Sequence, residues 1–463
     1  MKQSWFEKSV RVGLFAGLLL AGVLANAQVQ TVPEPAAPVV GTPGNYLVTF
    51  QPGTSQADRA ASVRNVGAAL RFNYSIVESV AVTVPNVNVF AALQRDPSVL
   101  KIIVDHPVFA FQGNGQGKGK PGGGGGGEPT DDVVQPGVLR VGAPTSGSNG
   151  NGVGVAIVDT GIDFNHPDLA GAIDDTQSFT AYASCQDDHG HGTHVAGIVG
   201  ARDNTIDVVG VAPMATLYCA KVLDSTGSGW DSDITAALDW VATDGQTYTP
   251  PIRVVNMSLG RSKTADDTDD HPMRVAVKNL YQQGVAVVVA AGNDSTKEVS
   301  QMVPAGYPEV LAVASSTAVD GTNNRCRFFT GTIAADTASS FTTDGAGVAI
   351  SAPGEEAEDV NKPCFVVSKG ILSLKLGGGT TRMSGTSMAS PHVAGIVARL
   401  IQMMGYGGNR APGYRLNPAG VEDVRTDIRA NANAFRVGDA PLDPPPGISY
   451  TFDGEREGIA KAP

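Results

Sequence analysis

The chain has few charged residues for its length, and its only long apolar segment lies near the N-terminus. Charged side chains make up 17% of the 463 residues, and acidic ones outnumber basic ones by 45 to 33. The resulting net charge of −12 argues against nucleic acid and an anionic membrane as partners. Hydrophobic residues still reach 42%, which is enough for a sizeable buried core. We therefore expect a globular protein, and a monomer.

The first 27 residues have the pattern of a secretory signal peptide. A basic segment at 2–11 precedes an apolar stretch at 13–24 and an A-x-A cleavage site that ends at Ala27. The alternative is a membrane anchor, but about 12 apolar residues are too few to cross a bilayer, which needs roughly 20. No later stretch reaches that length. We expect a protein secreted to the extracellular space or the periplasm.

Only four cysteines are present, and none forms a C-x-x-C pair that would indicate zinc or a redox site. In an exported protein an even number of cysteines favours disulfides, and four cysteines allow three pairings. Proximity in the chain favours Cys185 with Cys219 and Cys326 with Cys364, which we state as a hypothesis.

Changes in composition divide the chain into segments. A Pro-rich spacer at 28–44 precedes a small α+β unit at 45–112, and a linker with six consecutive glycines follows at 113–128. Such a linker is flexible and is a natural place for proteolytic release. In the small unit we expect strands at 46–50, 76–84 and 100–104, and helices at 57–70 and 87–93. A Pro-containing tail occupies 436–463.

The large remaining domain, 129–435, alternates short apolar runs with helical patterns. Continuous apolar strands between helices predict an α/β fold with a mostly parallel sheet that helices cover on both faces. Active sites in such folds lie at the carboxyl ends of the strands. The expected strands are 153–158, 217–222, 253–257, 285–290, 310–314 and 347–350.

Three segments of this domain carry residues for nucleophilic catalysis. Asp159 ends the first buried strand, His191 opens the segment HGTHVAG, and Ser387 lies in GTSMASP at the start of a helical pattern. A serine hydroxyl needs a base to take its proton, and a carboxylate can orient that base. A helix start also favours developing negative charge, and Pro391 suits the first turn of such a helix.

These three segments, in the order Asp, His, Ser, resemble the triad motifs of the subtilase family of serine peptidases. The resemblance covers roughly residues 130–432 and implies a subtilisin-like three-layer fold and a secreted serine endopeptidase without a catalytic metal. It also identifies 45–112 as similar to the family's inhibitory propeptide. We therefore expect a zymogen that cuts itself in or near residues 112–129.

Further positions follow from the resemblance. Asn293, in AAGN, matches the residue that stabilises the oxyanion. Two segments match the edges that pair with the substrate backbone, and they comprise Ser258, Leu259 and Gly260, and Gly227, Ser228 and Gly229. Backbone pairing requires a protein or peptide substrate in extended conformation. Met302 aligns near the floor of the first pocket and favours apolar side chains over charged ones.

The resemblance also implies a structural Ca²⁺ site. Its expected ligands are Asp168, Asn204, Ile206 and Val208, with Asp132 near the mature N-terminus. Carboxylate, amide and carbonyl oxygens suit a hard cation. The loop departs from the family pattern at Asp207.

Two other classes of function deserve comparison. The segment HGHGTH at 189–194 resembles a zinc-binding motif of metallohydrolases, but Thr193 stands where that motif has Asp. The second alternative is an inactive subtilase-like binding protein, which the intact motif residues disfavour. The neighbouring Asp163, His166, His194 and His392 are expected to be structural.

Overall fold

The computed structural model describes residues 40–111, 133–324, 326, 331–361, 364–404, 418–434 and 458–463. The expected signal peptide, the Gly-rich linker, most of the tail and Asp132 fall outside these residues. No helix in the described part is both long and apolar enough to cross a membrane.

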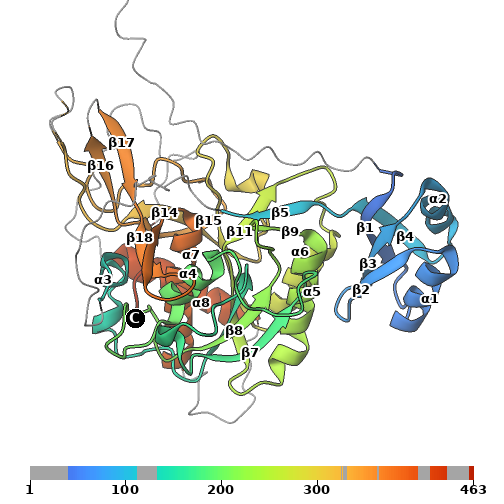
Figure 1. The fold of residues 1–463 in the computed structure, drawn as a ribbon, viewed down its shortest axis with the longest axis horizontal. Helices are drawn as coiled ribbons and strands as arrows, with labels where there is room; N and C mark the ends of the chain where they lie inside the picture. The colour runs from blue at the N-terminus through green and yellow to red at the C-terminus, as the bar shows by residue number, and fades with distance from the viewer. Residues whose placement is uncertain are drawn as a thin grey trace, which may run out of the picture. The chain divides into compact units, whose positions relative to one another are not determined.

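The small N-terminal unit is a four-stranded antiparallel sheet with two helices on one face (Figure 1). The sheet order is β2-β3-β1-β4, and β1 alternates so that Tyr46, Val48 and Phe50 enter the unit's own core. Leu47 points to the other face and joins a core shared with the large domain. Its elements are β1 (Gly44–Phe50), α1 (Gln56–Val66), β2 (Ala69–Asn73), β3 (Ser79–Val84), α2 (Val87–Arg95) and β4 (Val99–Val104).

The first helix of this unit is shorter than predicted. The expected helix at 57–70 ends at Val66, because Gly67 adopts φ +86° and its N–H closes the helix onto carbonyls of the last turn. The chain then reverses, and Leu70 lies in β2, which the sequence did not predict. Helices often end at a glycine in the left-handed conformation, so Gly67 in the sequence could have indicated where this helix ends.

The large domain contains a seven-stranded sheet, parallel throughout, in the order β15-β14-β12-β10-β6-β8-β7. The α/β fold and each predicted strand are confirmed. The strands are β6 (Gly154–Asp159), β7 (Ile173–Ser178), β8 (Thr216–Lys221), β10 (Ile252–Met257), β12 (Ala286–Ala290), β14 (Leu311–Thr317) and β15 (Val348–Glu355).

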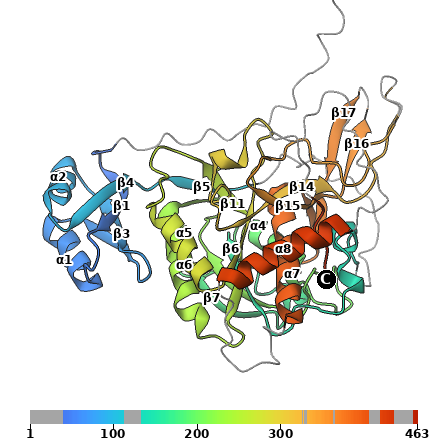
Figure 2. The same cartoon turned by 180° about the vertical axis from the view of Figure 1, so that it is seen from behind.

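Helices cover both faces of this sheet, so that the domain has three layers (Figures 1 and 2). Within β6, Val155 and Ile157 face a core formed with α4 (His191–Gly200) and α7 (Thr386–Met403). Ala156 and Val158 face the core of α5 (Asp231–Ala242) and α6 (Pro272–Gln282). Strands buried on both faces explain why their sequences are apolar throughout rather than alternating. Figure 2 shows α8 (Pro418–Ala434) next to α7.

A second small sheet joins the two units. Its order is β13-β11-β5-β9, with β5 (Pro107–Ala110) antiparallel to both β11 (Leu259–Ser262) and β9 (Ser228–Trp230). The strand β13 (Met302–Val303) completes it. The sequence did not predict β5, whose partners lie more than a hundred residues away in the chain.

The remaining elements are hairpins, short helices and the C-terminal residues. Both hypothesised disulfides, Cys185–Cys219 and Cys326–Cys364, are confirmed. The final residues pack against the sheet edge, where Ala460 donates its N–H to Ser351 at 2.8 Å and is fully buried. The other elements are β16 (Ala357–Asn361), β17 (Phe365–Lys369), β18 (Ile371–Leu374), β19 (Thr380–Met383), α3 (Pro136–Arg140) and the 3-10 helices Ala143–Thr145, Pro167–Leu169, Asp244–Gln246 and Val299–Gln301.

Candidate active site

Asp159 and His191 form a buried pair at the carboxyl end of the sheet. His191 Nδ1 donates to Asp159 Oδ1 at 2.7 Å, and both side chains have no exposed surface. The first turn of α4 can approach β6 closely because residue 192 is glycine, where a Cβ atom would lie 2.0 Å from the Gly161 carbonyl oxygen. The carboxylate thereby fixes the histidine tautomer and leaves Nε2 as the proton acceptor.

Ser387 lies in the first turn of α7, after Gly385 as the N-cap. Its Oγ donates to the Ser258 carbonyl oxygen at 2.9 Å, whereas His191 Nε2 is buried without a hydrogen-bond partner. The serine hydroxyl is therefore turned away from the histidine in this structure. Rotation about χ1 moves a hydroxyl between staggered positions, and catalytic hydrogen bonds often form only once substrate is bound.

Pro391 lies one turn later in the helix than predicted. Since α7 begins at Thr386, Pro391 is its sixth residue and belongs to the second turn. A proline there cannot donate to the carbonyl four residues earlier, which is that of Ser387. The freed carbonyl accepts from Ser258 Oγ at 2.9 Å instead. The proline thus costs little, and it links the serine's backbone to the end of β10.

The Asn293 amide is held in one orientation. Its Oδ1 accepts two hydrogen bonds from Thr386, from the backbone N–H and from Oγ1, each at 2.9 Å. Because two donors meet at Oδ1, the Nδ2 group is free to point into the site as a donor. Asn293 follows β12, so the parallel sheet brings it to the same edge as Asp159 and Ser258.

The last residue of the small unit that the structure describes, Phe111, accepts a hydrogen bond from the Asn293 amide. Asn293 Nδ2 donates to the Phe111 carbonyl oxygen at 2.8 Å, and the Phe111 N–H donates to Ser258 O at 3.3 Å. One residue earlier, Ala110 donates its N–H to Gly227 O at 2.9 Å. The two predicted substrate-binding edges, 227–229 and 258–260, therefore flank residues 107–111 as an extended strand.

Two side chains of this strand pack against the large domain. A Cβ atom on Gly260 would lie 2.7 Å from Phe111 Cζ, so the ring lies against bare backbone. Val108 is fully buried on the same strand and belongs to the core shared with α5. Met302 is also buried, and its Cε would lie 3.1 Å from a Cβ atom on Gly292.

In the part of the chain that the structure describes, the segment HGHGTH belongs to no group of three His, Cys, Asp or Glu side chains with ligand atoms within 4.8 Å of one another. His194 Nε2 hydrogen-bonds to Ile371 O at 3.1 Å, and burial lowers its pKa to about 3. His392 bonds to Met388 O at 2.7 Å, and burial lowers its pKa to about 4. Both are neutral at ordinary pH. In Asp163, hydrogen bonds from Gln186, Gly377 and Asn165 hold the pKa low, although burial opposes them.

The residues predicted to bind calcium form a connected loop. Asp168 is buried, and its Oδ2 accepts the Val208 N–H at 3.1 Å. Asn204 Oδ1 accepts the Ile206 N–H at 2.9 Å, and Asp207 adopts φ +53°. A bridge joins Val133 to Val208 in this loop. The oxygen-rich donor set fits a hard cation.

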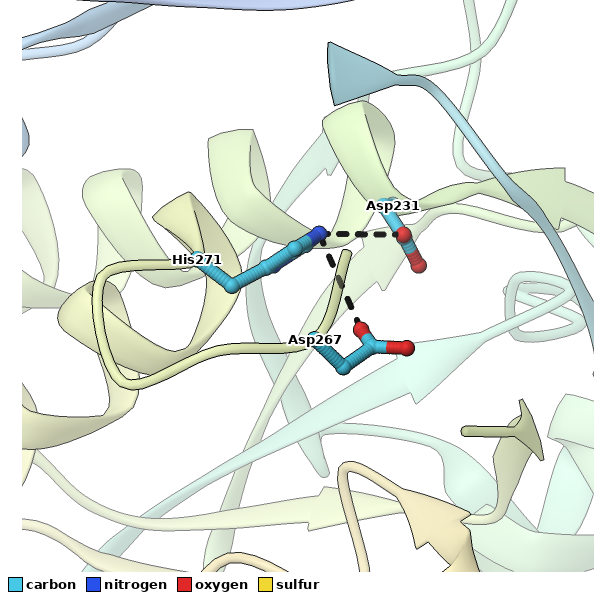
Figure 3. Close-up of side chains that lie close together, drawn as sticks. All are labelled: Asp231, Asp267 and His271. Atoms are coloured by element: carbon cyan, nitrogen blue, oxygen red, sulfur yellow. Dashed lines mark ion pairs between the residues drawn. The ribbon is translucent and has the colours of Figure 1, made fainter. Parts of the chain in front are cut away.

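Within the described residues, one group of three acidic and histidine side chains has its ligand atoms within 4.8 Å, namely Asp231, Asp267 and His271 (Figure 3). These residues could hold a metal by composition. However, Arg261 already donates to both carboxylates, at 2.6 Å to Asp231 Oδ2 and 2.6 Å to Asp267 Oδ1. The guanidinium supplies the positive charge, and it holds the pKa of Asp267 near 2, although burial opposes this.

Sequence reasoning missed two features of the site. The strand at 107–110 was not assigned, although Val108, Phe109, Ala110 and Phe111 form a short apolar run that could have indicated it. The Arg261 network was also missed, because buried ion pairs join residues that no local motif connects.

A parallel sheet covered by helices, a buried Asp–His pair and a serine at a helix start are together typical of serine hydrolases. The family model "Subtilase family" matches residues 150–434. The chain is 30% identical over 406 residues to subtilisin E of Bacillus subtilis (strain 168), which covers 85% of this chain and 89% of that protein.

Two further relatives agree. Subtilisin Savinase of Lederbergia lenta is 39% identical over 270 residues, or 58% of this chain and 83% of that protein. The crystal structure of a cold adapted subtilisin-like serine proteinase has a TM-score of 0.50 at 29% identity and covers 68% of this chain and 91% of that chain. The chain belongs to the subtilase family and is a subtilisin-like serine endopeptidase.

Proposed function

We propose that Ser387 is the nucleophile, His191 the general base and acid, and Asp159 the group that orients it. Ser387 Oγ attacks the substrate carbonyl, and its proton passes to His191 Nε2, the nitrogen that Asp159 leaves free. The same proton then goes to the leaving amine, and water repeats the sequence to release the acyl group. The 2.7 Å hydrogen bond between His191 and Asp159 supports these roles.

Asn293 stabilises the oxyanion together with the Ser387 backbone N–H. Its Nδ2 donor is preorganised because Thr386 holds the other end of the amide. A donor fixed before the reaction needs no reorganisation when charge develops on the substrate oxygen. Substrates are protein or peptide segments that pair as an extended strand between 227–229 and 258–260.

The protein is made as a zymogen that cuts the bond after Phe111. One observation carries this proposal: the Phe111 carbonyl oxygen accepts from Asn293 Nδ2 at 2.8 Å while residues 107–110 pair with both groove edges. That carbonyl has the position of a substrate carbonyl about to be attacked. The small unit, residues 45–111, then remains as an inhibitor in the groove, and the mature enzyme begins at Gln112 before any further trimming.

Expression of the parent beside Ser387→Ala tests both proposals. The parent should hydrolyse casein and show two fragments by intact mass, with a new N-terminus at Gln112. Ser387→Ala should stay whole and inactive. A Ser387→Ala chain that is cut after Phe111 when purified alone would refute self-processing, and an active Ser387→Ala enzyme would refute the nucleophile.

We further propose a structural Ca²⁺ ion held by Asp168, Asn204, and the carbonyls of Ile206 and Val208, with Asp132 as an added ligand. The loop geometry and oxygen donors support it. Chelator should lower the melting temperature of the Ser387→Ala protein, and Asp168→Asn should reduce that response. No effect of chelator on melting would remove the proposal.

We also propose that the protein is secreted, since residues 1–27 have a signal-peptide pattern and the relatives are subtilisins. Mass analysis of the Ser387→Ala protein recovered outside the producing cell should begin at Gln28. Retention inside the cell with Met1 intact would contradict this.

A further inference from the structure

Two glutamates near the edge of the large sheet are completely buried. Glu355 is the last residue of β15 and Glu358 the second of β16, with 0% and 1% of their surfaces exposed. Glu356 between them has a different environment, because it pairs with Lys369 and Arg382. The strand ends therefore direct one carboxylate to cations and bury the other two.

Most of the buried carboxylate oxygens have no hydrogen-bond partner. No hydrogen bond of ordinary geometry reaches either oxygen of Glu355 or Glu358 Oε2, although the side chains of Ser339, Ser368 and Glu358 lie close enough to Glu355 to shift its pKa. Glu358 Oε1 accepts the Ser340 N–H at 3.0 Å. In the part of the chain that the structure describes, neither glutamate forms an ion pair with Lys, Arg or His. Burial raises the pKa of Glu355 well above its ordinary value, and the charge of Glu358 raises it further.

Two adjacent buried negative charges require compensation. A single shared proton would join one oxygen of each glutamate, and it would leave one buried negative charge without a cation. A divalent cation would balance both charges, and three carboxylate oxygens could coordinate it. The hydroxyls of Ser339 and Ser368 also face Glu355 and lower its pKa, so that further oxygen donors are at hand.

We propose that Glu355 and Glu358 bind a hard divalent cation, with Ca²⁺ as the best match. All available donors are oxygens, without the nitrogen or sulfur that would favour zinc or copper. Glu355 contributes both oxygens, Glu358 contributes Oε2, and Ser339 and Ser368 contribute hydroxyls. The site is distinct from the Asp168 loop.

The ion would stabilise the segment that precedes the catalytic serine. Gly354, next to Glu355, accepts the Gly385 N–H at 3.0 Å. Ser368 shares a 2.6 Å hydrogen bond with Ser384. Both contacts end within three residues of Ser387, so the cation links the β16–β17 hairpin to the start of α7.

Metal content of the full chain in the Ser387→Ala background tests this site. Each protein is stripped with chelator, dialysed against Ca²⁺ and measured by elemental analysis and by melting temperature. Glu355→Gln/Glu358→Gln should hold one Ca²⁺ per chain fewer than the parent and should show a smaller rise in melting temperature on adding Ca²⁺. Glu356→Gln, the matched control, should keep the parental content.

Asp168→Asn tests whether the two sites are separate. This variant should lose the ion of the Asp168 loop, and combining it with Glu355→Gln and Glu358→Gln should lower the Ca²⁺ content by the sum of both losses. Should the double glutamine variant not fold, Glu358→Gln alone should bind Ca²⁺ about tenfold more weakly or worse. Unchanged Ca²⁺ content and response in the glutamine variants would overturn the proposal. A double variant that melts higher than the parent with the same ion content would also overturn it, in favour of a shared proton.

Discussion

Arg261 and Asp231 are joined by two hydrogen bonds between the two segments that flank residues 107–110, Nε to Oδ1 at 3.0 Å and Nη2 to Oδ2 at 2.6 Å. Arg261 belongs to β11, and Asp231 follows β9 directly as the first residue of α5. The pair therefore holds together the two strands between which residues 107–110 lie. Asp267 completes the network on the other side of the guanidinium.

Arg261→Met should destabilise the folded protein, because it leaves Asp231 and Asp267 buried without a cation. Removing one partner of a buried ion pair costs about 3–5 kcal/mol of unfolding free energy. Urea denaturation in the Ser387→Ala background measures the change without self-digestion. Lys297→Met, which removes a partly exposed ion pair with Asp294, should cost about 0–1 kcal/mol. Equal effects of the two changes would contradict the buried network.

Asn293→Ala should lower both the rate of self-processing and kcat on a peptide by about 10²–10³, with little change in KM. The amide donor acts on charge that develops during the reaction, so its loss affects the transition state more than substrate binding. Intact-mass time courses and steady-state kinetics measure these rates. Asn151→Ala, on the exposed surface, is the control and should match the parent. A variant that raised KM alone would assign Asn293 to binding.

Phe111→Asp should slow self-processing by about 10²-fold or more, since a charged side chain would replace the ring that packs on Gly260. Phe111→Tyr keeps the ring and should be processed within about tenfold of the parental rate. The measurement is the fraction of whole chain against time. If Phe111→Asp were cut after residue 111 at the parental rate, the contact of this side chain with Gly260 would not determine the rate of self-processing.

Acid should strengthen the contact between the small unit and α5. Asp105 accepts the Ser232 N–H at 2.9 Å, and burial together with the charge of Asp231 raises the pKa of Asp105 to about 6. Burial raises the pKa of Asp233 to about 7; the charge of Asp105 adds to this, and Arg71, paired with both carboxylates, opposes it.

A carboxyl with a raised pKa stays neutral in the folded protein where the unfolded chain ionises. Stability should therefore fall as pH rises from about 4 through 6 and 7, and then level. Unfolding free energies of the Ser387→Ala chain across this range measure the slope. Asp105→Asn should flatten the part between pH 4 and 6. An unchanged slope in that variant would show that Asp105 does not titrate there.

The candidate site residues were predicted from local motifs in the sequence. Asp159, His191 and Ser387 were predicted as catalytic because each lies in a short motif of a known kind, and the parallel sheet brings Asp159 within 2.7 Å of His191. Asn293 and the groove edges followed from the same resemblance. Each is a property of a few consecutive residues.

Features that depend on distant partners were not predictable. The strand at 107–110 exists because β9 and β11 pair with it, and its short apolar run is only a weak signal that does not identify these partners. The burial of Glu355 and Glu358 depends on the β16–β17 hairpin and on Ser340, which no periodicity connects. Pro391 was placed one turn early because the first residue of α7 is set by Gly385 and its contact with Gly354.

The position of β5 in the middle of its sheet affects how long the enzyme would stay inactive after it cuts itself. If the bond after Phe111 is cut as proposed, the middle strand belongs to a separate chain, and β9 and β11 lose the strand that lies between them. A substrate peptide would then take the place of β5 as the middle strand during each turnover. The released segment is itself such a peptide when it unfolds, so the first enzyme molecules to become free would destroy the inhibitors of the others. Activation would then proceed as an accelerating, irreversible event, with a delay set by how slowly the first segment leaves.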